Sequence, residues 1–216
     1  MIKAVIFDLD GLLVDSEVTW YKVCKEIVES HGHEFPLEDY VKNHSGKTIV
    51  DNAELYKVNY QLPYDNETIV DMMVASESRY VEQGIPLKEG ARELLEYLKE
   101  NGYKVILGTS STRERALTIL KGDDADGYFD EFVVGYDVER SKPFPDIFLL
   151  AAEKAGAKPE ECLVLEDSAA GIQAAYAAGI PVICIPDLKT PGEEDAAKTA
   201  AILPSLADVI EYLKEN

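Results

Sequence analysis

Hydrophobic and polar positions follow two kinds of pattern along most of the chain. Short runs of aliphatic and β-branched residues, each bounded by turn or helix signals, predict buried strands. Between them, apolar residues three or four positions apart predict helices. Strands that alternate with helices indicate an α/β core, in which a parallel sheet carries helices on both faces. The expected strands are residues 4–7, 105–107, 163–165, 182–185 and, more weakly, 132–134.

The helices of this core begin and end at recognisable signals. An apolar stripe over residues 91–98 is followed by a stop at Gly102. Ser111 and Glu114 have the spacing of a capping box and open a helix that ends near Gly122, and both helix capping and substrate contact are open roles for Ser111. Further helices are expected over residues 145–156, 168–179 and 206–213.

The segment 16–84 breaks the alternation of strands and helices. A helical stripe that includes Trp20 stops at Gly32, and Pro36 is well placed to begin the next helix. Residues 48–60 and 66–83 also have helical patterns, and no convincing strand is present. We therefore predict a helical cap domain at 16–84, inserted into a core formed by residues 1–15 and 85–216.

Composition and charge narrow the classes of partner. The 216 residues include 41 acidic and 21 basic side chains, and the formal net charge is −20. Such a surface repels polyanions, so we expect no nucleic acid and no membrane partner. No apolar run approaches about 18 residues, and the three cysteines are widely spaced. We expect a cytoplasmic monomer with buried free thiols, in which any anion site needs a local cation.

Polar residues follow the predicted strands, at the ends where ligands bind in open α/β sheets. Two aspartates follow the first strand, two hydroxyl residues follow the second, and two acidic residues follow the strand at 163–165. A basic loop precedes the helix at 145–156. We expect these groups to meet at one edge of the sheet. They are Asp8, Asp10, Thr109, Ser110, Lys142, Glu166 and Asp167.

The chemistry of this set points to phosphoryl transfer. Clustered carboxylates need a cation, and a site built from oxygen ligands suits Mg²⁺. An aspartate can act as a covalent nucleophile, and a second carboxyl group two residues away can move the proton of the leaving group. Hydroxyls and amides at the start of a helix, together with Lys142, can hold a phosphoryl group.

The order of these motifs resembles that of the haloacid dehalogenase-like superfamily. Any one motif is a weak signal, but all four occur in sequence and cover essentially the whole predicted core. Asp8-Leu9-Asp10-Gly11 with Val14-Asp15-Ser16 is similar to the first motif of the superfamily, and Thr109 is similar to the second motif. Lys142 in SKPFPD is similar to the third motif, and Glu166-Asp167 to the fourth.

The resemblance implies a Rossmann-like core, an aspartyl-phosphate mechanism and Mg²⁺ as cofactor. Asp8 would be the nucleophile and Asp10 the general acid and base. Thr109, with Ser110 beside it, and Lys142 would bind the transferring phosphoryl group. The metal would be held by Asp8, the backbone carbonyl of Asp10 and Asp167, with Glu166 beside or behind it.

Within the superfamily, the sequence looks closest to the β-phosphoglucomutase-like branch, whose members are mostly phosphatases. Asp10 favours phosphate esters, because dehalogenases and phosphonatases lack an aspartate at that position. The mutase carries an arginine shortly after a glycine that matches Gly46, where this chain has Lys47. We therefore predict a hydrolase, a Mg²⁺-dependent phosphatase of a small phosphorylated metabolite such as a sugar phosphate or a phosphoglycolate-like ester.

Two alternatives remain open, a phosphosugar mutase and a non-catalytic phospho-receiver or binding module. Specificity determinants are expected in the cap loop 43–47, and we expect Gly46 and Lys47 to contact the substrate. Trp20 lies on an apolar stripe, which favours packing over a substrate-facing role.

Overall fold

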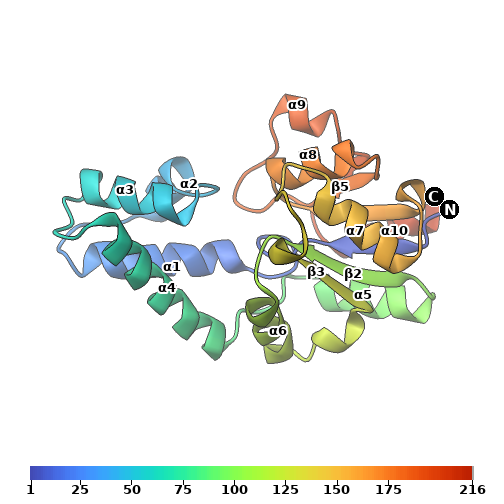
Figure 1. Ribbon diagram of the computed structural model, residues 1–216, viewed down its shortest axis with the longest axis horizontal. Coiled ribbons are helices and arrows are strands. Elements are labelled where there is room, and N and C mark those ends of the chain that lie inside the picture. The colour runs from blue at the N-terminus through green and yellow to red at the C-terminus, as the bar shows by residue number, and fades with distance from the viewer. Residues whose placement is uncertain (216) are drawn as a thin grey trace. The chain divides into compact units, whose positions relative to one another are not determined.

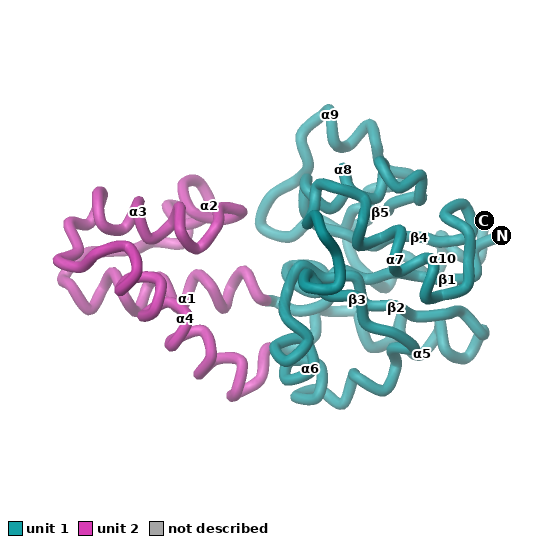
Figure 2. Tube along the Cα trace, viewed as in Figure 1, with its two compact units in different colours: residues 1–15, 86–216 teal, residues 16–85 magenta. Residues whose placement is uncertain are grey.

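The structure, a computed structural model, describes residues 1–215 and divides into two compact units (Figure 2). The first unit combines residues 1–15 with residues 86 to the end of the described chain. The second unit comprises residues 16–85. The chain thus leaves the first unit after one strand and returns to it some 70 residues later.

A six-stranded parallel sheet forms the centre of the first unit (Figure 1). Its strand order is β3-β2-β1-β4-β5-β6. All five predicted strands are confirmed, while β6 was not predicted, because two partly exposed residues carry no usable apolar pattern. The strands are β1 Ala4–Phe7, β2 Lys104–Thr109, β3 Glu131–Val134, β4 Cys162–Glu166, β5 Val182–Cys184 and β6 Ala201–Ile202.

Helices cover both faces of the sheet, as the alternating pattern predicted. Helices α7 and α8 pack on the face that presents Ala4, Ile6 and Val164. On the opposite face, α5 packs against β2 and α10 packs against α5. The helices are α5 Ala91–Glu100, α6 Arg113–Gly122, α7 Asp146–Ala155, α8 Ala169–Ala177, α9 Glu193–Ala196 and α10 Asp208–Glu215, with 3-10 turns η1 Asp126–Tyr128, η2 Gly135–Asp137 and η3 Pro159–Glu161.

The start of α6 differs from the prediction. Thr112 is the N-cap residue, and its side chain accepts a hydrogen bond from the Arg115 amide at 3.2 Å. Of the two roles open for Ser111, helix capping is therefore wrong. Ser111 instead donates its amide to Thr109 Oγ1 at 3.1 Å, and its hydroxyl accepts from the Arg115 guanidinium at 3.0 Å. Serine and threonine are both good caps, so spacing alone could not choose between them.

The second unit is entirely helical among its described residues. Its long helix α4 packs against α1 and α3. Thr48 and Asp65 cap α3 and α4 by accepting backbone hydrogen bonds. An aromatic cluster around the buried Phe35 and Tyr56 forms its centre. The helices are α1 Ser16–Glu29, α2 Leu37–Asn43, α3 Ile49–Asn59 and α4 Asn66–Gln83.

Two expectations from composition can be compared with the structure. Cys24, Cys162 and Cys184 are buried and free, as predicted. Burial raises the pKa of the Cys24 and Cys184 thiols to about 12, so both thiols are protonated at neutral pH. Among residues 1–215, no helix combines the length and the apolar character needed to cross a membrane.

Candidate active site

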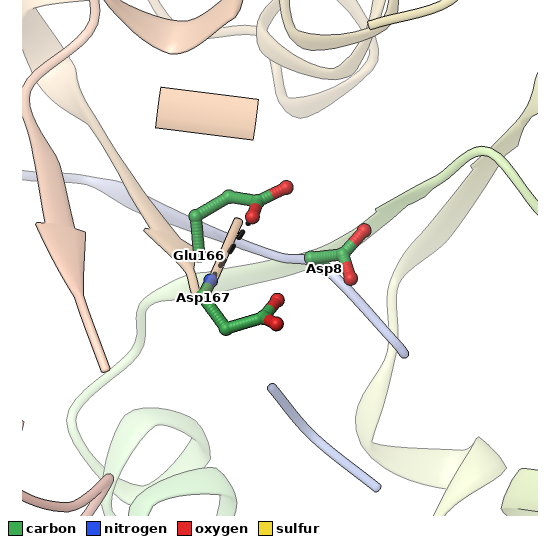
Figure 3. Close-up of side chains that lie close together, drawn as sticks. All are labelled: Asp8, Glu166 and Asp167. Carbon is green, nitrogen blue, oxygen red and sulfur yellow. Dashed lines mark hydrogen bonds between the residues drawn. The ribbon is translucent and has the colours of Figure 1, made fainter. Parts of the chain in front are cut away.

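Two neighbouring strands bring three carboxylates together at one edge of the sheet. Asp8 follows β1 directly, Glu166 ends β4 and Asp167 comes next. The parallel register pairs Phe7 with Leu165, so the ends of the two strands are level. One carboxylate oxygen from each of the three acids lies within 4.8 Å of the others (Figure 3).

Lys142 joins two of these acids. From the loop before α7, its Nζ donates to Asp8 Oδ1 at 2.5 Å and to Glu166 Oε1 at 2.7 Å. The side chain is only 7% exposed. Burial by itself would lower the pKa of Lys142, but the charges of Asp8 and Glu166 outweigh it and raise that pKa. Lys142 therefore stays positively charged and holds both carboxylates in place.

Glu166 is locked against the start of α8. Its Oε2 accepts from the amides of Asp167 and Ser168, at 3.0 and 2.9 Å, and from the Ser168 hydroxyl at 2.9 Å. The backbone of Gly171 lies so close that an added Cβ would be 1.7 Å from Glu166 Oε1. Lys142 and the helix start together satisfy both oxygens of this carboxylate, which suits a supporting role behind a metal.

The other two acids have fewer partners than Glu166: Asp8 accepts from Lys142 on one oxygen, and Asp167 Oδ1 accepts from none of the described residues. Burial raises the pKa of Asp8 to about 7, with Glu166 and Asp10 adding to the shift and Lys142 opposing it. Burial, followed by Glu166 and Asp8, raises the pKa of Asp167 well above its ordinary value. Asp167 Oδ1 is buried and has no hydrogen-bond partner in the described part of the chain. An unpartnered oxygen in a buried set of oxygen donors fits a divalent cation.

The loop after β1 closes tightly around this position. Gly11 has a φ of 81°, and a Cβ there would lie 2.4 Å from Asp167 Oδ2. Lys88 Nζ donates to the Gly11 carbonyl at 2.7 Å and to Asp187 Oδ1 at 2.6 Å. The sequence analysis missed both partners of this contact. Asp187 could have been found, because it follows β5 at the same edge of the sheet.

Thr109 and Ser110 mark the end of β2 next to the start of α6. Thr109 is 1% exposed and accepts the Ser111 amide on Oγ1. Ser110 is exposed, and a Cβ on Gly135 would lie 2.6 Å from its carbonyl oxygen. The hydroxyls and amides of this turn lead into a helix N-terminus, an arrangement that favours anions.

Asp10 takes a partner of its own. Arg115 in α6 binds its carboxylate in a bidentate manner, with Nη1 at 2.9 Å from Oδ2 and Nη2 at 2.8 Å from Oδ1. The Asp10 side chain is thus held by Arg115 and is separate from the three-carboxylate cluster. Arg115 also escaped the sequence analysis, although a charged residue in the first turn after Thr109 was a usable signal.

The second unit contains a pocket of about 180 Å³. Gly46 and Lys47 are exposed and line it, and the half-buried Trp20 forms part of its wall. His44 also lines the pocket and is 1% exposed. Its Nδ1 donates to Asn52 Oδ1 at 3.1 Å, while its Nε2 has no hydrogen-bond partner among the described residues. Trp20 therefore both packs in the unit and faces a cavity.

Known proteins resemble this chain in sequence and in fold over most of its length. The sequence pattern of the haloacid dehalogenase-like hydrolases matches residues 5–185. A phosphorylated carbohydrates phosphatase of Thermotoga maritima is 32% identical over 178 residues, 82% of each chain. Hexitol phosphatase B of Escherichia coli K12 is 31% identical and covers 86% of this chain and 84% of its own. The crystal structure of β-phosphoglucomutase from Clostridium difficile superimposes with a TM-score of 0.76 at 22% identity, over 100% of this chain and 96% of that one.

The chain belongs to the haloacid dehalogenase-like hydrolase family. This confirms the resemblance carried by its four motifs and the predicted fold class, a Rossmann-like core with an inserted helical cap. With phosphatase relatives across most of its length, the chain is a phosphoric monoester hydrolase of that family.

Proposed function

We propose that this enzyme is a Mg²⁺-dependent phosphatase of a small phosphorylated metabolite, a sugar phosphate or a phosphoglycolate-like ester. The observation that carries the proposal is the group of Asp8, Asp167 and Lys142 at one sheet edge, with Asp10 two residues beyond Asp8. This group combines a nucleophile, an oxygen-donor site and a buried positive charge.

The metal would be held by Asp8, Asp167 and the Asp10 carbonyl, with Glu166 behind them. The buried and unpartnered Asp167 Oδ1 supports this assignment. When bound, Mg²⁺ would cancel the repulsion between the Asp8 carboxylate and a phosphate dianion. The choice of Mg²⁺ over Ca²⁺ follows from the small number of protein ligands, since Mg²⁺ keeps several waters.

The reaction would proceed in two displacements at phosphorus. In the first, an Asp8 oxygen forms a bond to phosphorus, the ester P–O bond breaks, and Asp10 gives its proton to the departing alkoxide. In the second, Asp10 takes a proton from water, whose oxygen attacks the aspartyl-phosphate and releases phosphate from Asp8. Thr109, Ser110 and Lys142 would hold the three remaining phosphoryl oxygens throughout.

The cap would provide contacts to the rest of the substrate. Gly46 and Lys47 line a pocket with Trp20 and His44, which offers a cation, an aromatic wall and an imidazole nitrogen. We assign this pocket to the leaving group, because the set suits a small hydroxylated molecule and a polar head. Lys47 can supply a point charge there, although not the bidentate fork of an arginine.

The test is phosphate release from a panel of small phosphate monoesters with Mg²⁺, repeated with EDTA. Asp8→Asn should lower kcat by at least about 1,000-fold, since the nucleophile is lost. Asp124→Asn serves as the control, because Asp124 is an exposed aspartate of an acidic turn outside the site. Its rate should equal that of the wild type.

Other outcomes identify the alternatives. Full activity of Asp8→Asn would exclude the mechanism. Isomerisation of a sugar monophosphate, primed by a bisphosphate and with little phosphate release, would identify a mutase. A long-lived aspartyl-phosphate without turnover would identify a phospho-receiver.

A further inference from the structure

Arg115 is a charged residue at the reacting edge for which the proposed mechanism has no role. It lies in the first turn of α6, directly after the Thr109–Ser110 turn. Its guanidinium holds both oxygens of Asp10 and also donates to Ser111 Oγ. The side chain is 20% exposed and that of Asp10 is 35% exposed, so the pair is partly open to solvent.

Two other cations at this edge, Lys142 and Lys88, bind partners that are buried or mostly buried. Lys142 is 7% exposed and bridges Asp8 and Glu166. Lys88 donates to the Gly11 carbonyl and to Asp187, whose side chain is 11% exposed. Arg115 differs because one of its partners, Asp10, is a residue that must turn toward the leaving group during the reaction.

We propose that Arg115 is a specificity-determining residue that binds an anionic group on the leaving part of the substrate. The inference rests on the proposed phosphatase function and defines its substrate class. The substrates would be phosphate monoesters that carry a second anion, either a carboxylate or a second phosphate, close to the ester oxygen.

The geometry of the Arg115–Asp10 pair gives the reason. A guanidinium fork matches a carboxylate or a phosphate equally well, because both present two oxygens in one plane. In the free protein, Asp10 occupies that fork. A substrate anion that takes its place frees an Asp10 oxygen to approach the ester oxygen. A neutral leaving group offers no such replacement, so Asp10 stays bound to Arg115.

The overall charge strengthens the argument. A protein of net charge −20 repels a substrate with two anionic groups unless each group meets a local cation. Lys142 serves the transferring phosphoryl group, and Arg115 is placed to serve the other. This chain has Lys47 where the β-phosphoglucomutase cap has an arginine, and Arg115 supplies a guanidinium at a different place, in the core unit.

The experiment compares two esters that differ in one charge close to the ester oxygen, 2-phosphoglycolate and 2-hydroxyethyl phosphate. Steady-state kinetics are measured for wild type, Arg115→Met, Arg115→Lys and Arg113→Met. Arg113 is the matched control, because it lies in the same turn but binds Asp137 and the Phe132 carbonyl.

The wild type should favour the anionic member of the pair by about 10- to 100-fold in kcat/KM, the range of a charge-assisted hydrogen bond. Arg115→Met should abolish this preference by lowering kcat/KM far more for the anionic member than for the neutral member. Arg115→Lys should restore part of it, and Arg113→Met should retain all of it. Equal losses on both members, or no preference in the wild type, would overturn the proposal.

A binding measurement separates this proposal from the function on which it rests. Calorimetric titration of Asp8→Asn with 2-phosphoglycolate and 2-hydroxyethyl phosphate, in Mg²⁺, should show the same preference without turnover. The double variant with Arg115→Met should lose it. If p-nitrophenyl phosphate and every other ester release no phosphate, the proposed function fails. If turnover is present but neither kinetics nor binding depends on Arg115, the inference fails alone.

Discussion

Both oxygens of Glu166 already have partners, so this residue has little capacity left to bind the proposed metal directly. One oxygen binds Lys142 and the other binds the start of α8. Such a carboxylate positions its neighbours, because moving it would release Lys142 and the turn that presents Asp167. The close backbone of Gly171 makes this position sensitive to a single methyl group.

Gly171→Ala should therefore damage both the fold and the site. The new Cβ would overlap the Glu166 carboxylate, 1.7 Å from Oε1, and force it off Lys142. We expect a loss of roughly 1–3 kcal/mol in the free energy of unfolding, typical of overpacking, measured by urea denaturation, together with a large drop in kcat. Gly127→Ala is the control, since nothing lies within 4 Å of its Cβ position. Equal stability of the two variants would contradict the expected contact.

At the scale of elements, the turn between β2 and α6 connects Thr109 to Asp10 through Ser111 and Arg115. Thr112 caps α6, while Ser111 bonds to Thr109 and Arg115. Two adjacent hydroxyl residues thus have different tasks. One stabilises the helix, and the other links the turn to the guanidinium that holds Asp10.

The two tasks can be separated by mutation. Thr112→Ala should lower the free energy of unfolding by about 1 kcal/mol, the usual cost of losing an N-cap. Ser111→Ala should cost less, because no helix amide loses its acceptor. Urea denaturation of both variants, with Mg²⁺ absent, provides the comparison. A larger loss in Ser111→Ala would mean that Ser111 is the cap after all.

Sequence patterns were sufficient to predict the strands, most helices and the residues at the strand ends, but not the pairing of Arg115 with Asp10. The strands and most helices followed from runs of apolar residues and from stops such as Gly102, because burial imposes a local period. The carboxyl ends of the strands also located Asp8, Thr109 and Glu166, because all strands are parallel. The Arg115–Asp10 pair joins residues 105 positions apart, and no local pattern encodes which charged side chains of a folded edge will meet.

On the scale of the whole molecule, negative charge dominates. The formal net charge is −20, and three carboxylates meet at one edge of the sheet, where Lys142 bridges two of them, Asp8 and Glu166. Repulsion within this cluster opposes folding whenever the acids are ionised and no metal is bound. Stability should consequently depend on both pH and divalent cation.

An acid whose pKa is higher in the folded chain stabilises the fold below its unfolded pKa, and this contribution disappears as pH rises through the folded pKa. For Asp8 this pH range extends from the ordinary pKa of 3.8 to the folded-state pKa of about 7. The thermal midpoint of the metal-free protein should therefore fall across this range relative to that of Asp8→Asn. Asp124→Asn should follow the wild type.

Mg²⁺ should restore the stability that the metal-free protein loses at the upper end of this pH range. At 100 times its dissociation constant it would stabilise the folded state by about 2.7 kcal/mol, or roughly 5–10 °C for a chain of this size. Scanning calorimetry at pH 8, with EDTA and with Mg²⁺, measures this shift. Asp167→Asn should begin with a higher midpoint in EDTA, because it relieves the repulsion, and should gain little from Mg²⁺. An equal Mg²⁺ shift in wild type and Asp167→Asn would place the cation elsewhere on the acidic surface and remove Asp167 from the metal site.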